Sequence, residues 1–239
     1  MVAVGEPQAD NHAESLDYFD EEERYLGRAP RKEVHEKGLI NRHVAFLVLN
    51  QKGELLLQLR TEDKKDNPNT WDKPGGHVPS GEDYSAKEIL EEVCHGVLGT
   101  AFRMVSLPQL KCESAKADLE NTIVLAELAH IKNYISRRVK IDGSERMEKV
   151  HLKVYAGRYD GEVQPQPGEV RAVCWFSQQR LEREIAANPS RFGNDIKDLL
   201  ARFGTSIFAV SDLKFVPSRA GKDKNPVAPE GMVPGKRYG

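Results

Sequence analysis

The chain has 239 residues, of which 39% are hydrophobic and 30% are charged, which suffices for one or two soluble domains with a packed core. Lys and Arg total 35 against 37 Asp and Glu, so a formal net charge of -2 provides no overall field to attract nucleic acid or an anionic bilayer. The longest apolar runs, such as residues 44–49, are far shorter than the ~20 residues that cross a bilayer. We therefore expect neither a membrane nor a nucleic acid as the partner.

The cysteines and the N-terminus indicate the compartment. Three cysteines are an odd number and form no CxxC pair, which argues against a disulfide framework and against a structural zinc site. Residues 1–10 lack the basic region and the apolar region of a cleaved secretion signal. These features favour a cytoplasmic protein.

The N-terminal part contains one clear β-hairpin. Residues 13–24 crowd acidic side chains, and their pattern leaves open whether they form a short strand or an ordered arm. Residues 43–49 are a compact apolar run, and residues 54–60 resume it after the turn 50–53, which predicts two paired strands. The glycine pair 75–76 that follows can adopt backbone angles that other residues resist, which indicates a functional loop.

Two segments in the middle of the chain have helical spacing. Ser85 and Glu88 form a capping-box signature at the start of a predicted helix. Apolar residues recur on one face of that helix, at Ala86, Ile89, Leu90, Val93 and Val97. Residues 119–134 also place apolar side chains at helical spacing, which predicts a second helix.

The later part alternates strands and helices. Residues 151–159 and 170–176 predict strands, residues 178–187 predict a helix with a serine N-cap, and residues 194–203 predict a shorter helix that ends at a glycine. No internal repeat is present, so this order favours an α/β or α+β sandwich over a solenoid. After Val216 the chain is rich in Pro, Gly and Lys, which predicts a loosely ordered tail.

Three carboxylates of the capped helix share one face. Glu88, Glu91 and Glu92 stand three and four residues apart, opposite the apolar face. Each like-charged neighbour pair costs ~0.2–0.5 kcal/mol on a bare helix unless a cation compensates it. Oxygen ligands suit a hard ion such as Mg²⁺ or Mn²⁺, which points to phosphate chemistry. The alternative is an ordinary solvated helix face in which Glu88 serves only the cap.

Other phosphate-binding or hydrolytic motifs do not fit. Residues 76–81 have the glycine spacing of a Walker loop, but Glu82 and Asp83 follow where Lys and Ser or Thr are needed. No GxGxxG follows a strand, and no serine lies in a GxSxG elbow. The sequence therefore favours a metal-assisted reaction on a phosphate compound over these chemistries.

The stretch GGHVPSGEDYSAKEILEEV resembles the Nudix box, G-x5-E-x7-R-E-U-x-E-E-x-G-U, in which U is a bulky aliphatic residue. Gly76 and Glu82 match its opening, and residues 87–93 match its closing half if three residues are missing between the two. Lys87 replaces the arginine of the pattern, and Cys94 stands where glycine is expected. Residues 16–65 also resemble Nudix proteins related to isopentenyl-diphosphate isomerase, and residues 168–192 resemble the closing strand and helix of Nudix domains.

The resemblance implies an α/β fold, a Nudix-type α/β/α sandwich with a mixed β-sheet. Residues 14–204 would form the Nudix domain, with an insertion around 101–147. A flexible segment, 1–13, would precede it, and a loosely ordered tail, 205–239, would follow it.

The same resemblance assigns metal ligands. Glu91 and Glu92 would bind Mg²⁺ or Mn²⁺, with Glu88 as a further ligand or general base and the Gly76 carbonyl as another ligand. Glu169 is a candidate for an additional acid from a later loop, and a plain turn carboxylate is the alternative.

Four basic residues are candidate substrate ligands. Arg60 and Lys64 resemble the diphosphate-binding pair of the isomerase branch, and guanidinium or ammonium groups suit phosphate oxygens. Lys73 and Arg42 are further candidates, with His43 beside Arg42. Surface charge exposed to solvent is the alternative for Lys64 and Arg42.

The leading hypothesis is a Nudix pyrophosphohydrolase acting on a nucleoside diphosphate derivative or a similar small metabolite, with a homodimer left open. The main alternative is a Nudix-like module that binds a ligand without turnover, because the shortened box can misplace the attacking water. An isomerase is disfavoured, since the loop before Gly75 should supply a cysteine and residues 69–73 contain none.

Overall fold

The computed structural model describes residues 14–84, 101–163, 170–209 and 232–234. The predicted helix that begins at Ser85 lies outside these residues, as do Glu88, Glu91, Glu92 and Glu169. The strands are β1 (Ser15–Phe19), β2 (Tyr25–Pro30), β3 (Ile40–Leu49), β4 (Leu55–Arg60), β5 (Trp71–Asp72), β6 (Gly75–His77), β7 (Ala101–Val105), β8 (Thr122–Val139), β9 (Glu145–Arg158), β10 (Val170–Phe176) and β11 (Met232–Pro234). The helices are α1 (Arg31–Glu36), α3 (Leu107–Ser114), α4 (Gln178–Ala187), α5 (Asn194–Phe208) and the 3-10 turn η2 (Pro189–Arg191).

The strands form one mixed sheet in the order β11-β10-β4-β3-β9-β8-β7. β3 pairs with β9 in parallel and β7 with β8 in parallel, while the other neighbours on this path are antiparallel. β6 pairs with β3 and β5 with β4 along short stretches. The predicted mixed α/β architecture is confirmed.

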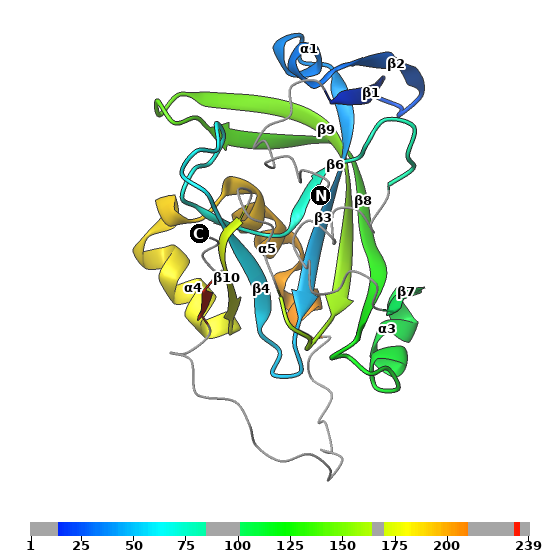
Figure 1. The fold of residues 1–239 in the computed structure, drawn as a ribbon, viewed down its shortest axis with the longest axis vertical. Helices are drawn as coiled ribbons and strands as arrows, with labels where there is room; N and C mark the ends of the chain where they lie inside the picture. The colour runs from blue at the N-terminus through cyan, green and yellow to red at the C-terminus, as the bar shows by residue number, and fades with distance from the viewer. Residues whose placement is uncertain (1–13, 85–100, 164–169, 210–231, 235–239) are drawn as a thin grey trace, which may run out of the picture.

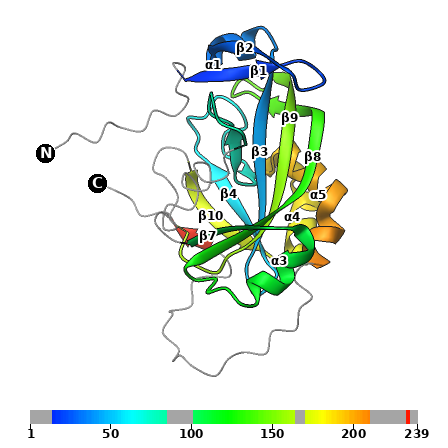
Figure 2. The same ribbon diagram turned by 90° about the vertical axis from the view of Figure 1, so that its right-hand side faces the viewer.

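β3 is buried on both faces, as expected for a central strand. Ala45, Leu47 and Leu49 belong to the core cluster that contains Leu181 of α4 and Leu199 of α5. The alternate residues of β3 belong to a second cluster on the opposite face. Figures 1 and 2 show α4 and α5 together on one side of the sheet, with α1, β1 and β2 at one end.

Several predicted elements are confirmed. The hairpin of residues 43–60 corresponds to β3 and β4, and residues 170–176 form β10 as predicted. Residues 13–24 contain the strand β1, which pairs with β2 and β3. The Ser177 hydroxyl caps α4 by accepting the backbone N–H of Arg180 at 3.3 Å. The predicted strand over 151–159 is part of the longer β9.

The predicted helix over 119–134 is wrong, because residues 122–134 belong to β8. Ile123 and Leu125 lie in one core cluster, while Val124 and Ala126 lie in the other, which is the two-residue alternation of a strand. β8 also has a hydrogen-bonded neighbour on each side, β7 and β9. Pairing with strands distant in sequence therefore overrides the helical spacing of a short apolar run.

The predicted end of the last helix at Gly204 is also wrong, since α5 continues to Phe208. Glycine inside a helix costs ~1 kcal/mol relative to alanine. Ile207 and Phe208 are buried in the core beyond it, and burying each side chain contributes ~1.5–3 kcal/mol. The free energy gained by burying these two side chains thus exceeds the cost of the glycine, and the helix continues past Gly204.

β8 and β9 extend past the rest of the sheet as a two-stranded arm. The register between them shifts at two places, and the second shift, between Ile131 and Tyr134, includes Asn133 with a positive φ of 56. Figure 1 shows the two strands bending and running over one end of the molecule. In the described parts of the chain, no helix is both long and apolar enough to span a membrane.

Candidate functional site

A cavity of about 440 Å³ lies beneath the β8–β9 arm. Its walls come from α1, from β3, β4 and β6, from the loop after β4, from the arm and from the start of α5. Lining residues are Glu14, Arg31, His35, His43, Val44, Gln58, Arg60, Lys64, Asp66, Asp72, Lys73, Gly75, Gly76, His77, Tyr134, Ser136, Arg138, Arg146, Glu148, Val150, Leu152 and Asp195. Most of these side chains are polar or charged, so the cavity suits a polar ligand.

Strand alternation explains why the arm supplies so many of these side chains. Ser136 pairs with Glu148 and Arg138 with Arg146 across the two strands. Residues two apart on a strand share a face, and directly paired residues share it too. The inner face of the arm therefore presents these four polar side chains together, and all four line the cavity.

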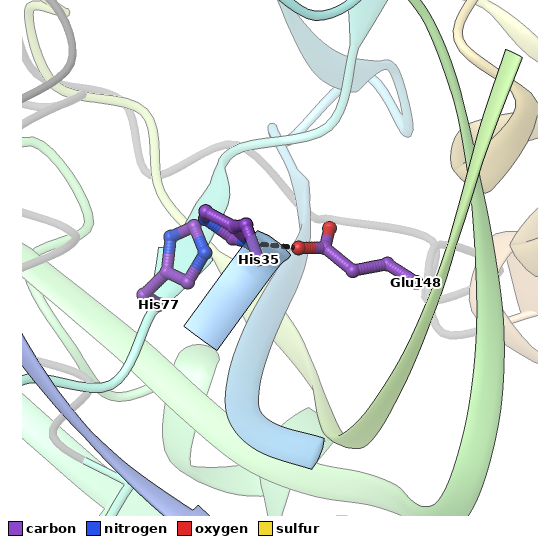
Figure 3. A group of neighbouring side chains, drawn as sticks. All are labelled: His35, His77 and Glu148. Atoms are coloured by element: carbon purple, nitrogen blue, oxygen red, sulfur yellow. Dashed lines mark ion pairs between the residues drawn. The ribbon is translucent and has the colours of Figure 1, made fainter. Parts of the chain in front are cut away.

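Three lining residues that are far apart in the sequence converge in the structure (Figure 3). His35 of α1, His77 of β6 and Glu148 of β9 each offer one ligand atom, and these atoms lie within 4.8 Å of one another. His35 Nδ1 contacts Glu148 Oε1 directly. His43 of β3 stands next to them, with its ring centroid 4.3 Å from that of His77.

The protonation states of this group suit a cation. Burial lowers the pKa of His43 to about 3 and, together with the neighbouring His43, the pKa of His77 well below its usual value. Burial opposes ionisation of Glu148, but its hydrogen bond with His35 and the charge of Arg138 hold its pKa well below the usual range. The neutral His77 imidazole and the ionised Glu148 carboxylate are in the forms that bind metals at neutral pH.

Unpartnered polar atoms point to the same interpretation. His43 Nε2 and His77 Nε2 are buried and have no hydrogen-bond partner among the described residues. Buried polar atoms without partners are rare and call for an ion or water that completes them. Imidazole nitrogen with carboxylate oxygen suits Mn²⁺, Fe²⁺ or Zn²⁺ better than an all-oxygen magnesium site. His35, His77 and Glu148 therefore form a candidate metal centre.

This centre was not predicted from the sequence. His77 was noted only as part of the glycine loop, and no role was predicted for His35 or Glu148. Their spacing matches no local metal motif, since the three ligands come from a helix, a short strand and the arm. A signal was present in the sequence, because His35 and His43 flank the start of the first core strand and His77 directly follows the glycine pair.

Four predicted site residues line this cavity. Gly76 lies next to His77, and Arg60, Lys64 and Lys73 contribute positive charge. The Arg60 guanidinium donates to the Asp66 carbonyl at 2.9 and 3.1 Å, which fixes its direction. Lys64 and Lys73 are only 6% and 7% exposed, so neither is an ordinary surface charge.

Arg42 lies elsewhere. Its guanidinium packs over the Phe19 ring at 4.2 Å and the Tyr84 ring at 4.8 Å, and it pairs with Glu23 at 2.9 Å. Adjacent strand residues point to opposite faces, so His43 faces the cavity while Arg42 faces away from it. Arg42 thus does not line the cavity. Its contacts instead connect β3 with the turn that follows β1.

Gly75 must be glycine for this site to form. β6 lies against β3 there, and a Cβ at position 75 would overlap the Val44 carbonyl oxygen. We expect Gly75→Ala to lower the free energy of unfolding by about 1–3 kcal/mol, as overpacking does. Urea denaturation followed by circular dichroism measures it.

A matched substitution is Gly204→Ala, because a Cβ at position 204 meets no heavy atom within 4 Å. The free energy of unfolding of this variant should rise by about 0.5–1 kcal/mol, because glycine is unfavourable in the interior of a helix. Equal stabilities of the two variants would mean that β6 does not approach β3 this closely.

Comparisons with known proteins agree with this architecture. The model of the NUDIX domain matches residues 39–107. A Nudix hydrolase of Clostridium acetobutylicum, described as uncharacterized, is 32% identical over 146 residues, which cover 56% of this chain and 70% of that protein. The chain belongs to the Nudix family. This confirms the resemblance noted in its box, although the helix of the box lies outside the described residues.

Other Nudix relatives match with different coverage. An uncharacterized Nudix hydrolase of Pseudomonas aeruginosa is 42% identical over 90 residues, which cover 36% of this chain and about half, 53%, of that protein. The isopentenyl-diphosphate Delta-isomerase of Rhodobacter capsulatus is 29% identical over 191 residues, with 78% of this chain and 92% of that protein covered. A crystal structure from Deinococcus radiodurans has a TM-score of 0.56 at 21% identity, covering 79% of this chain and 98% of that one, and it shows the shared fold.

Proposed function

We propose that this Nudix protein is a metal-dependent hydrolase that cleaves the diphosphate linkage of a nucleoside diphosphate derivative or a similar small metabolite. The observation that carries the proposal is the convergence of His35, His77 and Glu148 in a cavity that basic side chains also line. A divalent cation supplies Lewis acidity toward phosphoryl oxygens and lowers the pKa of a bound water. The C. acetobutylicum and P. aeruginosa relatives are described as Nudix hydrolases, which supports this enzyme class.

Two sets of residues would hold cations. The box carboxylates Glu88, Glu91 and Glu92, with the Gly76 carbonyl, provide hard oxygen ligands that suit Mg²⁺ or Mn²⁺. Glu169 is the proposed additional acid. His35, His77 and Glu148 provide the second, nitrogen-containing set. Gly76 and His77 are adjacent in β6, so the glycine loop links the two sets along the chain.

Basic side chains of the cavity would bind the phosphate oxygens. Arg60 and Arg146 can form charge-assisted hydrogen bonds with a diphosphate, and Lys64 and Lys73 add charge at its walls. The cavity volume of about 440 Å³ falls within the range of small-molecule sites. A small phosphorylated metabolite therefore fits better than a polymer.

Two alternatives have specific observations behind them. The shortened Nudix box favours a module that binds a ligand without turnover. The long match to the R. capsulatus protein favours an isopentenyl-diphosphate isomerase, but the cavity contains the charged side chains of Lys73, Arg138 and Asp195. These groups pair with one another but leave little apolar surface for a hydrocarbon chain, and residues 69–73 lack the cysteine expected of an isomerase, so the isomerase is the weaker alternative.

The deciding experiment is a substrate panel. The full chain is freed of metal with a chelator, supplied with Mg²⁺ or Mn²⁺, and incubated with nucleotide sugars, dinucleotides, nucleoside triphosphates and isopentenyl diphosphate. Metal-dependent release of phosphorylated products from one of the nucleotide compounds would support the hydrolase. Binding of those compounds without cleavage would contradict it and favour the binding module, and isomerisation of isopentenyl diphosphate would favour the isomerase.

A further inference from the structure

Asp195 occupies an unusual position for a helix residue. It stands in the first turn of α5 and is the residue of that helix that lines the cavity. The residue is only 4% exposed. A buried carboxylate is costly unless charged or hydrogen-bonding groups surround it, so its partners indicate why it is there.

Four side chains hold this carboxylate in place. The Ser136 hydroxyl lies 3.0 Å from both carboxylate oxygens, and the Tyr134 hydroxyl donates to Oδ1 at 3.3 Å. Arg138 Nη2 lies 3.1 Å from Oδ2, and Lys73 Nζ lies 3.7 Å from the same oxygen. Burial opposes ionisation, but Arg138 and Lys73 lower the pKa of Asp195, so the carboxylate is charged at neutral pH.

Arg138 connects Asp195 to the candidate metal centre. Its Nε lies 3.7 Å from Glu148 Oε2, while its Nη2 is closer to Asp195, at 3.1 Å. The other oxygen of Glu148, Oε1, contacts His35. The largely buried guanidinium of Arg138 is thus shared between two carboxylates. Its shorter contact is with Asp195, which is not one of the proposed metal ligands.

Loss of the Asp195 charge would change this sharing. Of the two carboxylates, only Glu148 would then remain to pair with Arg138. Arginine readily forms a bidentate interaction with a single carboxylate. Such a bond would occupy the Glu148 oxygens that a cation needs. Asp195 therefore limits the competition between the guanidinium and a cation for the same ligand.

We propose that Asp195, acting through Arg138, is a positioning residue that keeps the Glu148 carboxylate available to a divalent cation bound with His35 and His77. The proposal rests on the proposed metal centre, but it does not require that the protein hydrolyse any particular substrate. It assigns a role in the site to α5, which lies beyond the residues that the NUDIX domain model matches.

The test measures Mn²⁺ affinity of the full chain by calorimetry, without substrate. Asp195→Asn should weaken Mn²⁺ binding ~10-fold or more, which is the usual effect of losing a group that orients a metal ligand. Glu184→Gln is the matched control, because Glu184 is a partly buried helix carboxylate on α4 that pairs with Arg180 and does not line the cavity. It should keep the wild-type dissociation constant within about twofold.

A double-mutant cycle separates a role through Arg138 from loss of charge alone. If Asp195 acts through Arg138, adding Asp195→Asn to Arg138→Gln should change the Mn²⁺ dissociation constant by less than about twofold. The same drop in affinity in both backgrounds, or no drop in Asp195→Asn alone, would overturn the proposal. Thermal unfolding checks that each variant folds, and Asp195→Ser replaces Asp195→Asn under the same criteria if that variant does not.

Failure of this inference can be told apart from failure of the proposed function. Wild-type protein that binds no Mn²⁺ would overturn both the inference and the histidine centre. Mn²⁺ affinity that falls in His77→Ala but stays unchanged in Asp195→Asn would overturn the inference alone.

Discussion

Replacing His77 with alanine is expected to weaken Mn²⁺ binding by at least ~10²-fold, because loss of a direct ligand should exceed the 10–100-fold effect of losing a group behind a ligand. His77 supplies one of the three converging ligand atoms, and its Nε2 is buried without a hydrogen-bond partner among the residues described. Alanine removes that nitrogen and leaves space that water can fill. Calorimetric titration of chelator-treated protein with Mn²⁺ measures the effect.

His130→Ala provides the control for this prediction. His130 is also a histidine with a carboxylate partner, since its Nε2 lies 3.0 Å from Glu23, but it is exposed and does not line the cavity. Its removal should leave Mn²⁺ affinity unchanged. If both variants bind Mn²⁺ as the wild type does, the histidine group holds no metal, and its contacts serve only the packing of α1 against the arm.

Glu91→Gln is expected to lower turnover at least ~10²-fold while the protein remains folded, since a carboxylate that holds a catalytic metal loses both its charge and its ligand strength as an amide. Glu91 lies outside the described residues, so its role rests on the resemblance of residues 76–93 to the Nudix box. The rate is measured with the substrate that the panel identifies, at saturating metal.

Glu182→Gln is the matched control, because Glu182 is exposed on α4 and its carboxylate accepts a hydrogen bond from Gln178 of the same helix. Its rate should equal that of the wild type. An unchanged rate in Glu91→Gln would remove Glu91 from the site. If His77→Ala also loses activity, the two results would indicate that the histidine centre, and not Glu91, holds the catalytic metal.

Local patterns predicted the elements that are stabilised locally. The hairpin of β3 and β4 follows from two apolar runs around a short turn, and α4 follows from its serine cap. The cap is a contact between Ser177 and Arg180, three residues apart. Interactions of this range can be read from the sequence.

Elements that depend on distant partners could not be predicted in this way. β8 has apolar residues at spacings that fit a helix, but β7 and β9 pair with it on either side. α5 passes through Gly204 because Ile207 and Phe208 reach the core. In both segments the tertiary contacts outweigh the local preference, and those contacts are set by the order of the strands.

The residues of the candidate site also differ in how far the sequence could predict them. The basic residues Arg60, Lys64 and Lys73 and the glycine loop were predicted to be near a ligand, and they do share one cavity. Glu148 could not be placed from the sequence, because the parallel pairing of β3 with β9 and the bend of the arm bring it to His35. The sequence also could not separate Arg42 from His43 until the face of each on β3 was known.

Anomalous diffraction from crystals of the full chain soaked with Mn²⁺ tests most directly whether this cavity is a metal site. We predict a peak in the cavity, within bonding distance of His35, His77 and Glu148, in the wild type and its absence in His77→Ala. A fully soaked crystal of the wild type with no peak among these three side chains would contradict it.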